Sequence, residues 1–365
     1  MGLATTGVEQ TWRRHDDLAE VASPGRSAIL RLTSPGLPPV ILEDSAAVIW
    51  QLIDGAVTHS DLAAAVAETY GQPVGQVDGA VAEFLDGLTT TGLLVRQTTA
   101  SLRLSVLGVP VLVEIGGSEG AALAERLGEA WANCLADDSS EEPAVTISVT
   151  VDDPSELMAT LEWATQQITT DAVSIRAGEL LMFHAGAVAD PATGASVVLV
   201  GPSGMGKTTL AAALGRHWGY VTDETAAIDE TGRLCRYPKP LSVIEPGHDS
   251  KVQRSPGSLG LLEAPDELQV RAVLLLDRRN RDAGGGTHSA EAETGLVVEA
   301  VSNVPAIAML AEHTSYLGRL EQPLNRIAEL LKATGGLRIV RYSTTDDLIP
   351  LIAELLGDRA VGENE

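Results

Sequence analysis

One eight-residue segment, residues 201–208, constrains this chain more than any other feature of its sequence. It reads Gly-Pro-Ser-Gly-Met-Gly-Lys-Thr and matches the phosphate-loop pattern G-x-x-x-x-G-K-[ST] at every fixed position. An apolar run at residues 196–200 precedes it and predicts a strand, while residues 209–214 predict the start of a helix. Chance rarely supplies strand, loop and helix together, so we expect a nucleotide-binding loop here.

Each residue type in this loop has a specific role in holding a polyphosphate. Glycines allow backbone N–H groups to curve around a β-phosphate, and the helix N-terminus adds positive potential there. Lys207 is expected to neutralise β- and γ-phosphate oxygens, and the Thr208 hydroxyl is expected to ligate Mg²⁺. ATP and Mg²⁺ are therefore the predicted cofactors. The residues predicted to bind them are Gly201, Ser203, Gly204, Met205, Gly206, Lys207, Thr208 and Thr209.

Two carboxylates, Asp223 and Glu224, follow the next predicted strand at residues 219–222. If that strand runs parallel to the one before the phosphate loop, both carboxyl ends lie on one edge of the sheet, where ligands bind in open α/β folds. Asp223 would then accept the proton of an attacking hydroxyl, and Glu224 would help to hold the metal. Without the phosphate loop upstream, a simple turn made by two strand-end carboxylates would be the better interpretation.

Other candidate residues are less distinctive. His184 lies in an apolar strand-like run, residues 180–189, where alternation separates it from Leu181 and Phe183. A histidine in such a strand is more often a satisfied core residue than a catalytic one. A basic segment at residues 236–242 reads Arg-Tyr-Pro-Lys-Pro-Leu-Ser and either presents cations to phosphate or substrate or forms a solvated turn. The same alternatives hold for Arg278, Arg279 and Arg281.

Composition excludes several classes of protein. The chain has 365 residues, which suggests two domains, and a formal net charge of −25, which repels nucleic acid. An acidic surface suits a basic peptide partner, and it suits solubility equally well. Cys134 and Cys235 have no metal-ligand spacing, so neither a disulfide framework nor a zinc site is expected. The sequence shows no signal-peptide profile and no bilayer-length apolar run, which predicts a cytoplasmic protein without a membrane partner.

The order of predicted elements divides the chain into four parts. We expect an irregular segment at residues 1–25, a small domain at 26–97, a larger domain at 98–356 and an acidic tail at 357–365. The small domain begins with strands at residues 28–32 and 40–42, and three amphipathic helices follow. The larger domain alternates strands and helices, which indicates an α/β fold. Its predicted elements are helices at 120–136, 304–310, 324–332 and 345–356, strands at 145–151, 180–189, 219–222, 272–276 and 337–342, an acidic loop at 137–142 and a glycine-rich hinge at 284–286.

The larger domain resembles the HPr serine kinase fold family, including its peptide and serine kinase-like relatives. The resemblance rests on Phe-His-Ala at residues 183–185, the phosphate loop, the carboxylates at 223–224 and Tyr-Pro-Lys-Pro at 237–240. It implies an α/β P-loop kinase-like fold of the HPr kinase/PEP carboxykinase type. It also implies that His184 and Asp223 assist the attacking hydroxyl. Two departures stand out: the family usually shows Asp-Asp where this chain has Asp223-Glu224, and the E-[IV]-R-G-L-G segment is missing, which argues against HPr as substrate.

Residues 15–96 resemble a PqqD-like domain, the small winged-helix α+β recognition element of pathways that make peptide natural products on the ribosome. The matching segments are residues 42–50, 54–55 and 81–95. The resemblance implies that the leader of a precursor peptide pairs with the edge of the third strand and packs on the third helix. Most of the apolar stripe at residues 77–88 is expected to be domain core. A DNA-binding winged helix is another interpretation, and the acidic charge of the chain argues against it. The residues predicted to contact peptide are Val40, Ile41, Leu42, Val77, Val81 and Phe84.

These features together lead to one function and two alternatives. We expect a kinase that phosphorylates a Ser or Thr hydroxyl of a ribosomally made precursor peptide, with Asp223, His184 and Lys207 as catalytic residues and Thr208 and Glu224 as metal ligands. The first alternative is a non-catalytic scaffold with a degenerate kinase-like domain that recognises the leader. The second is a small-molecule kinase with a regulatory peptide sensor. Further expected partners are other maturation enzymes of the pathway and, by analogy with related kinases, a second copy of the chain.

Overall fold

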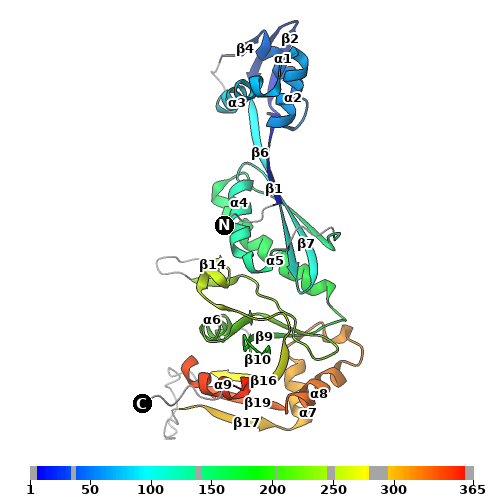
Figure 1. The fold of residues 1–365 in the computed structure, drawn as a ribbon, viewed down its shortest axis with the longest axis vertical. Coiled ribbons are helices and arrows are strands. Elements are labelled where there is room, and N and C mark those ends of the chain that lie inside the picture. Colours follow the sequence, from blue (N-terminus) through cyan, green and yellow to red (C-terminus); the bar gives the residue numbers. More distant parts are fainter. Residues whose placement is uncertain are drawn as a thin grey trace. The chain divides into compact units, whose positions relative to one another are not determined.

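The computed structural model describes residues 6–33, 38–136, 141–202, 204–244, 251–278 and 295–357, with only the backbone at residues 6–9 and 98. These residues form two compact units (Figure 1). The first comprises Met1–Arg103, Leu112–Gly128 and Thr146–Ala164, and the second comprises Leu104–Val111, Glu129–Val145 and Thr165–Glu365. The predicted acidic loop lies mostly outside the described residues. Several other parts of the chain lie wholly outside them, namely Ser203, Arg279, Arg281, the glycine-rich hinge and residues 358–365 of the tail.

A small α+β domain opens the first unit. Its antiparallel sheet has the order β2 (Leu18–Ser23), β3 (Arg26–Arg31) and β4 (Val40–Glu43). Three helices follow, namely α1 (Ser45–Leu52), α2 (His59–Tyr70) and α3 (Val74–Thr90), as the sequence predicts. The Thr58 hydroxyl accepts a hydrogen bond from the Asp61 N–H and caps α2. Trp50, Ile53, Val81 and Leu85 fill the core between sheet and helices.

Two sequence expectations about this region are wrong. Residues 1–25 are not irregular, because they contain β1 (Thr6–Arg14) and β2. The predicted boundary near residue 97 is also wrong, because β6 (Leu94–Val106) runs through it without a break and pairs antiparallel with β1. A short polar stretch that contains threonine suits a strand that pairs on both sides, so polarity alone did not mark a linker here.

A second sheet joins β5 (Val57–Thr58), β1, β6, β7 (Val109–Gly116) and β8 (Val145–Thr150) in that order. Helix α4 (Gly120–Ala130) is shorter than the predicted helix, because the chain continues as a 3-10 turn at Ala132–Cys134. Helix α5 (Leu157–Ile175) was not predicted at all. Its sequence is rich in threonine and glutamine, which weaken the apolar stripe by which such helices are found.

The second unit is built on a mixed sheet with the order β15-β11-β9-β10-β16-β19-β17. Strand β9 (Leu181–Ala189) is antiparallel to both β10 (Ala195–Val200) and β11 (Gly219–Thr222), so β10 and β11 run in the same direction on either side of it. Strand β10 is parallel to β16, and β16 is parallel to β19. The remaining bounds are β12 (Thr225–Ile228), β15 (Leu262–Glu263), β16 (Gln269–Arg278), β17 (Val297–Val301), β18 (Thr314–Ser315) and β19 (Leu337–Tyr342).

Helices cover both faces of this sheet. Alternate residues of β10 point into two separate cores, with Val198 and Val200 on one side and Val197 and Leu199 on the other. The first core also contains residues of α7 (Asn303–Ala311) and α8 (Pro323–Ala333), and the second contains residues of α6 (Lys207–Leu214) and α9 (Ile349–Leu356). A strand buried on both faces explains the continuous apolar run at residues 196–200.

Two smaller features complete the described fold. Strands β13 (Leu241–Ile244) and β14 (Lys251–Arg254) form an antiparallel ribbon that follows the proline-rich segment. Among the helices that the structure describes, none combines the length and the apolarity needed to cross a bilayer.

The buried position of Leu85 gives a direct test of the small domain. Leu85→Ala removes a fully buried side chain of α3 and is expected to lower the free energy of unfolding by about 2–5 kcal/mol. The control Val74→Ala changes a half-exposed residue of the same helix and is expected to cost no more than about 0.5 kcal/mol. Urea unfolding of the full chain, followed by circular dichroism, measures both. Equal effects of the two substitutions would contradict this packing.

Candidate functional site

The phosphate loop connects β10 to α6, as the sequence predicts. Gly204 (φ +81°) and Gly206 (φ +91°) have left-handed backbone conformations, which explains why glycine is required at both positions. Gly206 is the N-cap residue of α6 and has no side chain of its own to cover the positive end of the helix. A Cβ atom at Gly206 would lie 3.4 Å from Nη1 of Arg278, which places this β16 guanidinium beside the loop.

Lys207 folds back onto the loop that precedes it. Its Nζ donates hydrogen bonds to the backbone oxygens of Gly201 (2.8 Å) and Pro202 (2.9 Å). Burial lowers the pKa of Lys207, and the carboxylates of Asp223 and Glu224 oppose this shift. The ammonium group is thus held at the loop and within the electrostatic influence of both carboxylates.

The pair Asp223 and Glu224 lies in the turn between β11 and β12. The Thr222 hydroxyl accepts hydrogen bonds from the N–H groups of Glu224 and Thr225, both at 3.3 Å, and fixes this turn. Because β10 and β11 pair with opposite sides of β9 and run in the same direction, the loop and the carboxylates start from the same edge of the sheet. The predicted common edge is therefore confirmed.

Gly186 of β9 lies close to both α6 and the carboxylate turn. A Cβ atom at this position would lie 3.6 Å from the Ala211 Cβ atom of α6 and 3.8 Å from the Asp223 Cα atom, which are ordinary van der Waals contacts. An alanine would therefore fit here, whereas a longer side chain would press on the helix or the turn.

Asp223 is only 5% exposed, and with the described residues its side chain makes two polar contacts, both through Oδ1. The Tyr220 hydroxyl donates a hydrogen bond to this oxygen at 2.9 Å, and Nζ of Lys239 lies 3.7 Å from it. Burial and the Asp223 charge raise the pKa of Tyr220 well above its usual value, so this phenol stays a donor. Within the described chain, Oδ2 is the oxygen of Asp223 that these contacts leave for another partner.

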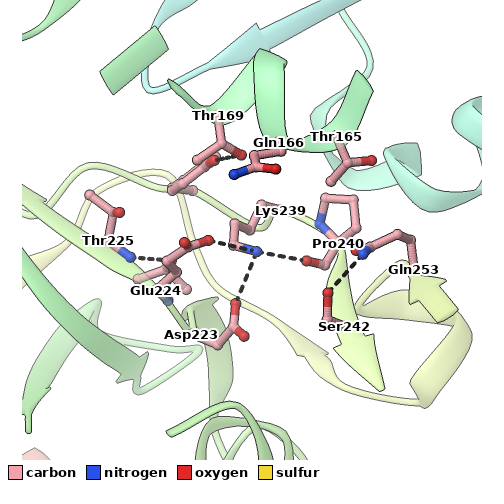
Figure 2. Close-up of polar contacts among 12 residues, drawn as sticks. Thr165, Gln166, Thr169, Asp223, Glu224, Thr225, Lys239, Pro240, Ser242 and Gln253 are labelled. Atoms are coloured by element: carbon pink, nitrogen blue, oxygen red, sulfur yellow. Dashed lines mark hydrogen bonds and ion pairs between the residues drawn. The ribbon is translucent and has the colours of Figure 1, made fainter. Parts of the chain in front are cut away.

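The sequence left open whether the basic segment at residues 236–242 presents cations to phosphate or substrate or forms a solvated turn, and it did not single out Lys239. In the structure Lys239 is buried, so it is not part of a solvated turn. Its Nζ lies 2.9 Å from Glu224 Oε2 and donates to the Pro240 backbone oxygen at 3.0 Å (Figure 2). Burial lowers the pKa of Lys239, but the Asp223 and Glu224 carboxylates outweigh it and raise the pKa overall. The sequence signal was present, because this lysine stands between two prolines in an otherwise acidic chain. Its burial could not be read from that signal.

His184 of β9 lies beside a second histidine, His313, which directly precedes β18. The backbone N–H of His184 donates to the His313 backbone oxygen at 2.7 Å, next to the pairing of β9 with β18. On its other side His184 pairs with Thr225 of β12. Burial lowers the pKa of His184, Lys207 lowers it further, and Glu224 and Asp223 oppose them. A half-buried imidazole that is neutral near pH 7 can accept a proton. His313 was not identified from the sequence.

The described residues suit a magnesium ion that is shared with a nucleotide. They contain no group of three His, Cys, Asp or Glu side chains that could hold a metal by themselves. Thr208 lies in the first turn of α6, partly exposed, and Glu224 is partly exposed although Oε2 contacts Lys239. Mg²⁺ keeps several waters and binds substrate phosphates with only one or two protein oxygens, so this donor set fits the ion.

The residues predicted to contact peptide fall into two groups. Ile41 is 57% exposed on β4, an edge strand of its sheet. Val40, Val77 and Phe84 are partly buried against the core of the small domain. Leu42 and Val81 belong to that core, so the structure corrects their expected role from contact residues to support.

Comparisons with known proteins find two similarities. Residues 40–94 match the family described as coenzyme PQQ synthesis protein D (PqqD). The chain is also similar to the structure of the Hpr(Ser) kinase/phosphatase from Coxiella burnetii, with 13% identity, a TM-score of 0.24, and coverage of 48% of this chain and 87% of that chain. No curated protein matches the chain. The PqqD-like resemblance seen in the sequence therefore has a counterpart in a known family, over residues 40–94.

The environment of His184 predicts its titration. The midpoint for protonation of this imidazole is expected below the usual histidine value of 6.5, and it should rise in Lys207→Met but stay below 6.5, because burial remains. Proton NMR measures it, with His184→Asn assigning the resonance. Lys332→Met removes an exposed lysine of α8 and should leave the midpoint unchanged. A midpoint that falls in Lys207→Met would contradict the described site.

Proposed function

We propose that this protein is a kinase that transfers the γ-phosphoryl group of ATP to a Ser or Thr hydroxyl of a ribosomally made precursor peptide. The observation that carries the proposal is the convergence of the phosphate loop, Asp223 and His184 at one edge of the sheet in the second unit. A loop alone would support nucleotide binding. A buried carboxylate with an oxygen left for a partner, beside a neutral imidazole, adds groups that can take a proton.

The proposed reaction conserves atoms and charge. The substrate hydroxyl oxygen forms a bond to the γ-phosphorus while the bond from that phosphorus to the β,γ-bridging oxygen breaks, and ADP leaves. The hydroxyl proton passes to Oδ2 of Asp223, with His184 nearby as a second acceptor. Most of the rate enhancement would come from positioning and charge neutralisation rather than from covalent chemistry.

The remaining residues of the loop hold the nucleotide in this proposal. Lys207 would exchange its two backbone partners, Gly201 and Pro202, for phosphate oxygens. Thr208 and Glu224 would hold Mg²⁺ together with those phosphates and water, and the ion would neutralise charge that develops on the transferred group. A cytoplasmic location, where ATP and Mg²⁺ are available, belongs to the same proposal.

The small domain supports a peptide as the substrate. PqqD domains bind precursor peptides in pathways of ribosomally made peptides. The Asp44 N–H donates to the Gly25 oxygen, and hydrogen-bonded pairs alternate along an antiparallel ladder. Leu42 and Val40 therefore bond to β3, whereas the backbone groups of Ile41 and Glu43 face the open edge of β4. This edge can accept a leader peptide as an added strand.

If the small domain holds the leader, a kinase site with little selectivity of its own can still act on one peptide. The rest of the tethered peptide then meets the kinase site within the same complex, and a short flexible connection raises its effective concentration there to about the millimolar range. The kinase site then needs little affinity of its own for the phosphorylated segment. Recognition and chemistry can reside in different domains.

A non-catalytic scaffold is the second candidate function. The observation that favours it is Lys239, whose ammonium group already occupies Glu224 Oε2 and lies near Asp223. If that contact persisted with nucleotide bound, the second carboxylate could not hold a metal. The chain would then present the peptide to another maturation enzyme.

Replacing Asp223 separates the two candidates. Asp223→Asn keeps the shape of the side chain and removes the proposed proton acceptor, so phosphoryl transfer is expected to fall by about 10²–10⁴-fold. The assay follows radiolabel from γ-labelled ATP to the peptide encoded beside the gene. ADP binding, measured by calorimetry, should change little.

Asp266→Asn is the matched control, because its side chain is 91% exposed and, among the described residues, bonds only to Arg236. It should leave the rate within about twofold, as surface changes usually do. Absence of transfer by the unmodified protein, with peptide binding intact, would favour the scaffold.

Replacing Ile41 tests the edge strand. Ile41→Pro removes an outward N–H group without removing a bond to β3, and is expected to weaken leader binding by about tenfold, since it leaves one peptide carbonyl without its donor. Ile41→Val keeps the N–H and the branched side chain and serves as the control. Fluorescence anisotropy with a labelled leader measures both. Equal affinity of the two variants would exclude strand addition at β4.

A further inference from the structure

The segment around Lys239 is held rigidly, which is unusual for a lysine between two prolines. Residues 237–240 are all buried, and the Lys239 side chain is only 8% exposed. The Tyr237 hydroxyl donates to the Thr169 hydroxyl of α5 at 2.9 Å, and Cys134 Sγ lies 3.5 Å from the Pro238 oxygen. The backbone therefore delivers the ammonium group to one fixed place.

Three oxygens surround that ammonium group, and two of them lie within hydrogen-bond distance. Glu224 Oε2 and the Pro240 oxygen lie within hydrogen-bond distance, and Asp223 Oδ1 lies at 3.7 Å, a distance at which charge attracts without a hydrogen bond (Figure 2). A buried ammonium ion is stable only when it is paired in this way. The same ion compensates two adjacent carboxylates that would otherwise repel each other and any polyphosphate.

The two lysines of the site have different partners. Lys207 bonds to backbone oxygens of the phosphate loop, so it can leave them for phosphate oxygens. Lys239 bonds to the carboxylate that precedes β12, so its removal would change the carboxylates rather than the phosphate loop. Both lysines carry the same charge, but replacing Lys207 and replacing Lys239 should affect function in different ways.

We infer that Lys239 is a positioning residue that fixes the orientation of Asp223 and Glu224 for the phosphoryl transfer proposed above. Its Nζ contacts both carboxylates of the turn between β11 and β12, while the Tyr220 hydroxyl holds the same Asp223 oxygen from β11. Within the described chain, these contacts leave Oδ2 of Asp223 as the acceptor. The inference rests on the proposed function for its kinetic part only.

The first experiment needs no substrate. Thermal unfolding of the unmodified protein, Lys239→Met, Lys239→Arg and the exposed-lysine control Lys332→Met is measured at pH 8.0. Lys239→Met should unfold at a temperature about 5 °C lower than the unmodified protein, because two adjacent carboxylates lose their cation. Lys239→Arg should recover most of the loss, and Lys332→Met should show none.

No loss of thermal stability in Lys239→Met, or an equal loss in Lys332→Met, would show that Lys239 does not hold the carboxylate turn and would overturn the inference.

A double variant keeps the test decisive if Lys239→Met does not fold. Glu224→Gln with Lys239→Met removes one carboxylate together with the lysine and should be more stable than Lys239→Met alone. Glu224→Gln alone should be less stable than the unmodified protein. Additive losses would show that the two side chains do not interact, which contradicts the inference.

Kinetics then connect Lys239 to the reaction. With γ-labelled ATP and the peptide encoded beside the gene, Lys239→Met should lower kcat by about 100-fold and change KM for ATP by less than about threefold, because Lys207 still contacts the phosphates. A change in KM alone would assign Lys239 to nucleotide binding instead. If the unmodified protein transfers no phosphate, the proposed function fails, while the unfolding experiment still decides the role of Lys239.

Discussion

Strand β9 is the element on which the site depends. It pairs with β10 and β11 along its second half and with β12 and β18 along its first half. Because each ladder fixes register, these pairings bring together the end of β10, the turn after β11 and two histidines that are far apart in the sequence. Ladder hydrogen bonds, rather than contacts between the functional side chains, therefore set the geometry of the site.

Charge is the second constraint. The chain has a formal net charge of −25, yet the site is locally balanced, with Lys207 and Lys239 beside Asp223 and Glu224. Two adjacent carboxylates repel each other and would repel a polyphosphate, and this repulsion grows in a partly buried environment. Burying one lysine against the carboxylates and leaving the other at the phosphate loop provides this balance.

Sequence reasoning found the parts of the site that short motifs specify. The phosphate loop, the carboxylates after β11 and the strand that contains His184 could be predicted because each is local in the chain. Lys239 and His313 could not, because their roles arise from pairing and burial between distant segments. The same limit explains the errors in the fold: β1 pairs with β6 across more than eighty residues, and α5 has too many polar residues for a clear apolar stripe.

The departure from an Asp-Asp pair has a physical reason in this geometry. Glu224 is one methylene longer than an aspartate, and its Oε2 reaches Lys239 Nζ at 2.9 Å, whereas the shorter Asp223 stays 3.7 Å from the same atom. An aspartate at position 224 would fall short of the ammonium group unless the turn moved. The longer side chain thus carries the ion pair, and the shorter one remains beside it with an oxygen for another partner. Glutamate at this position is consistent with a division of roles between two carboxylates rather than with the decay of a site.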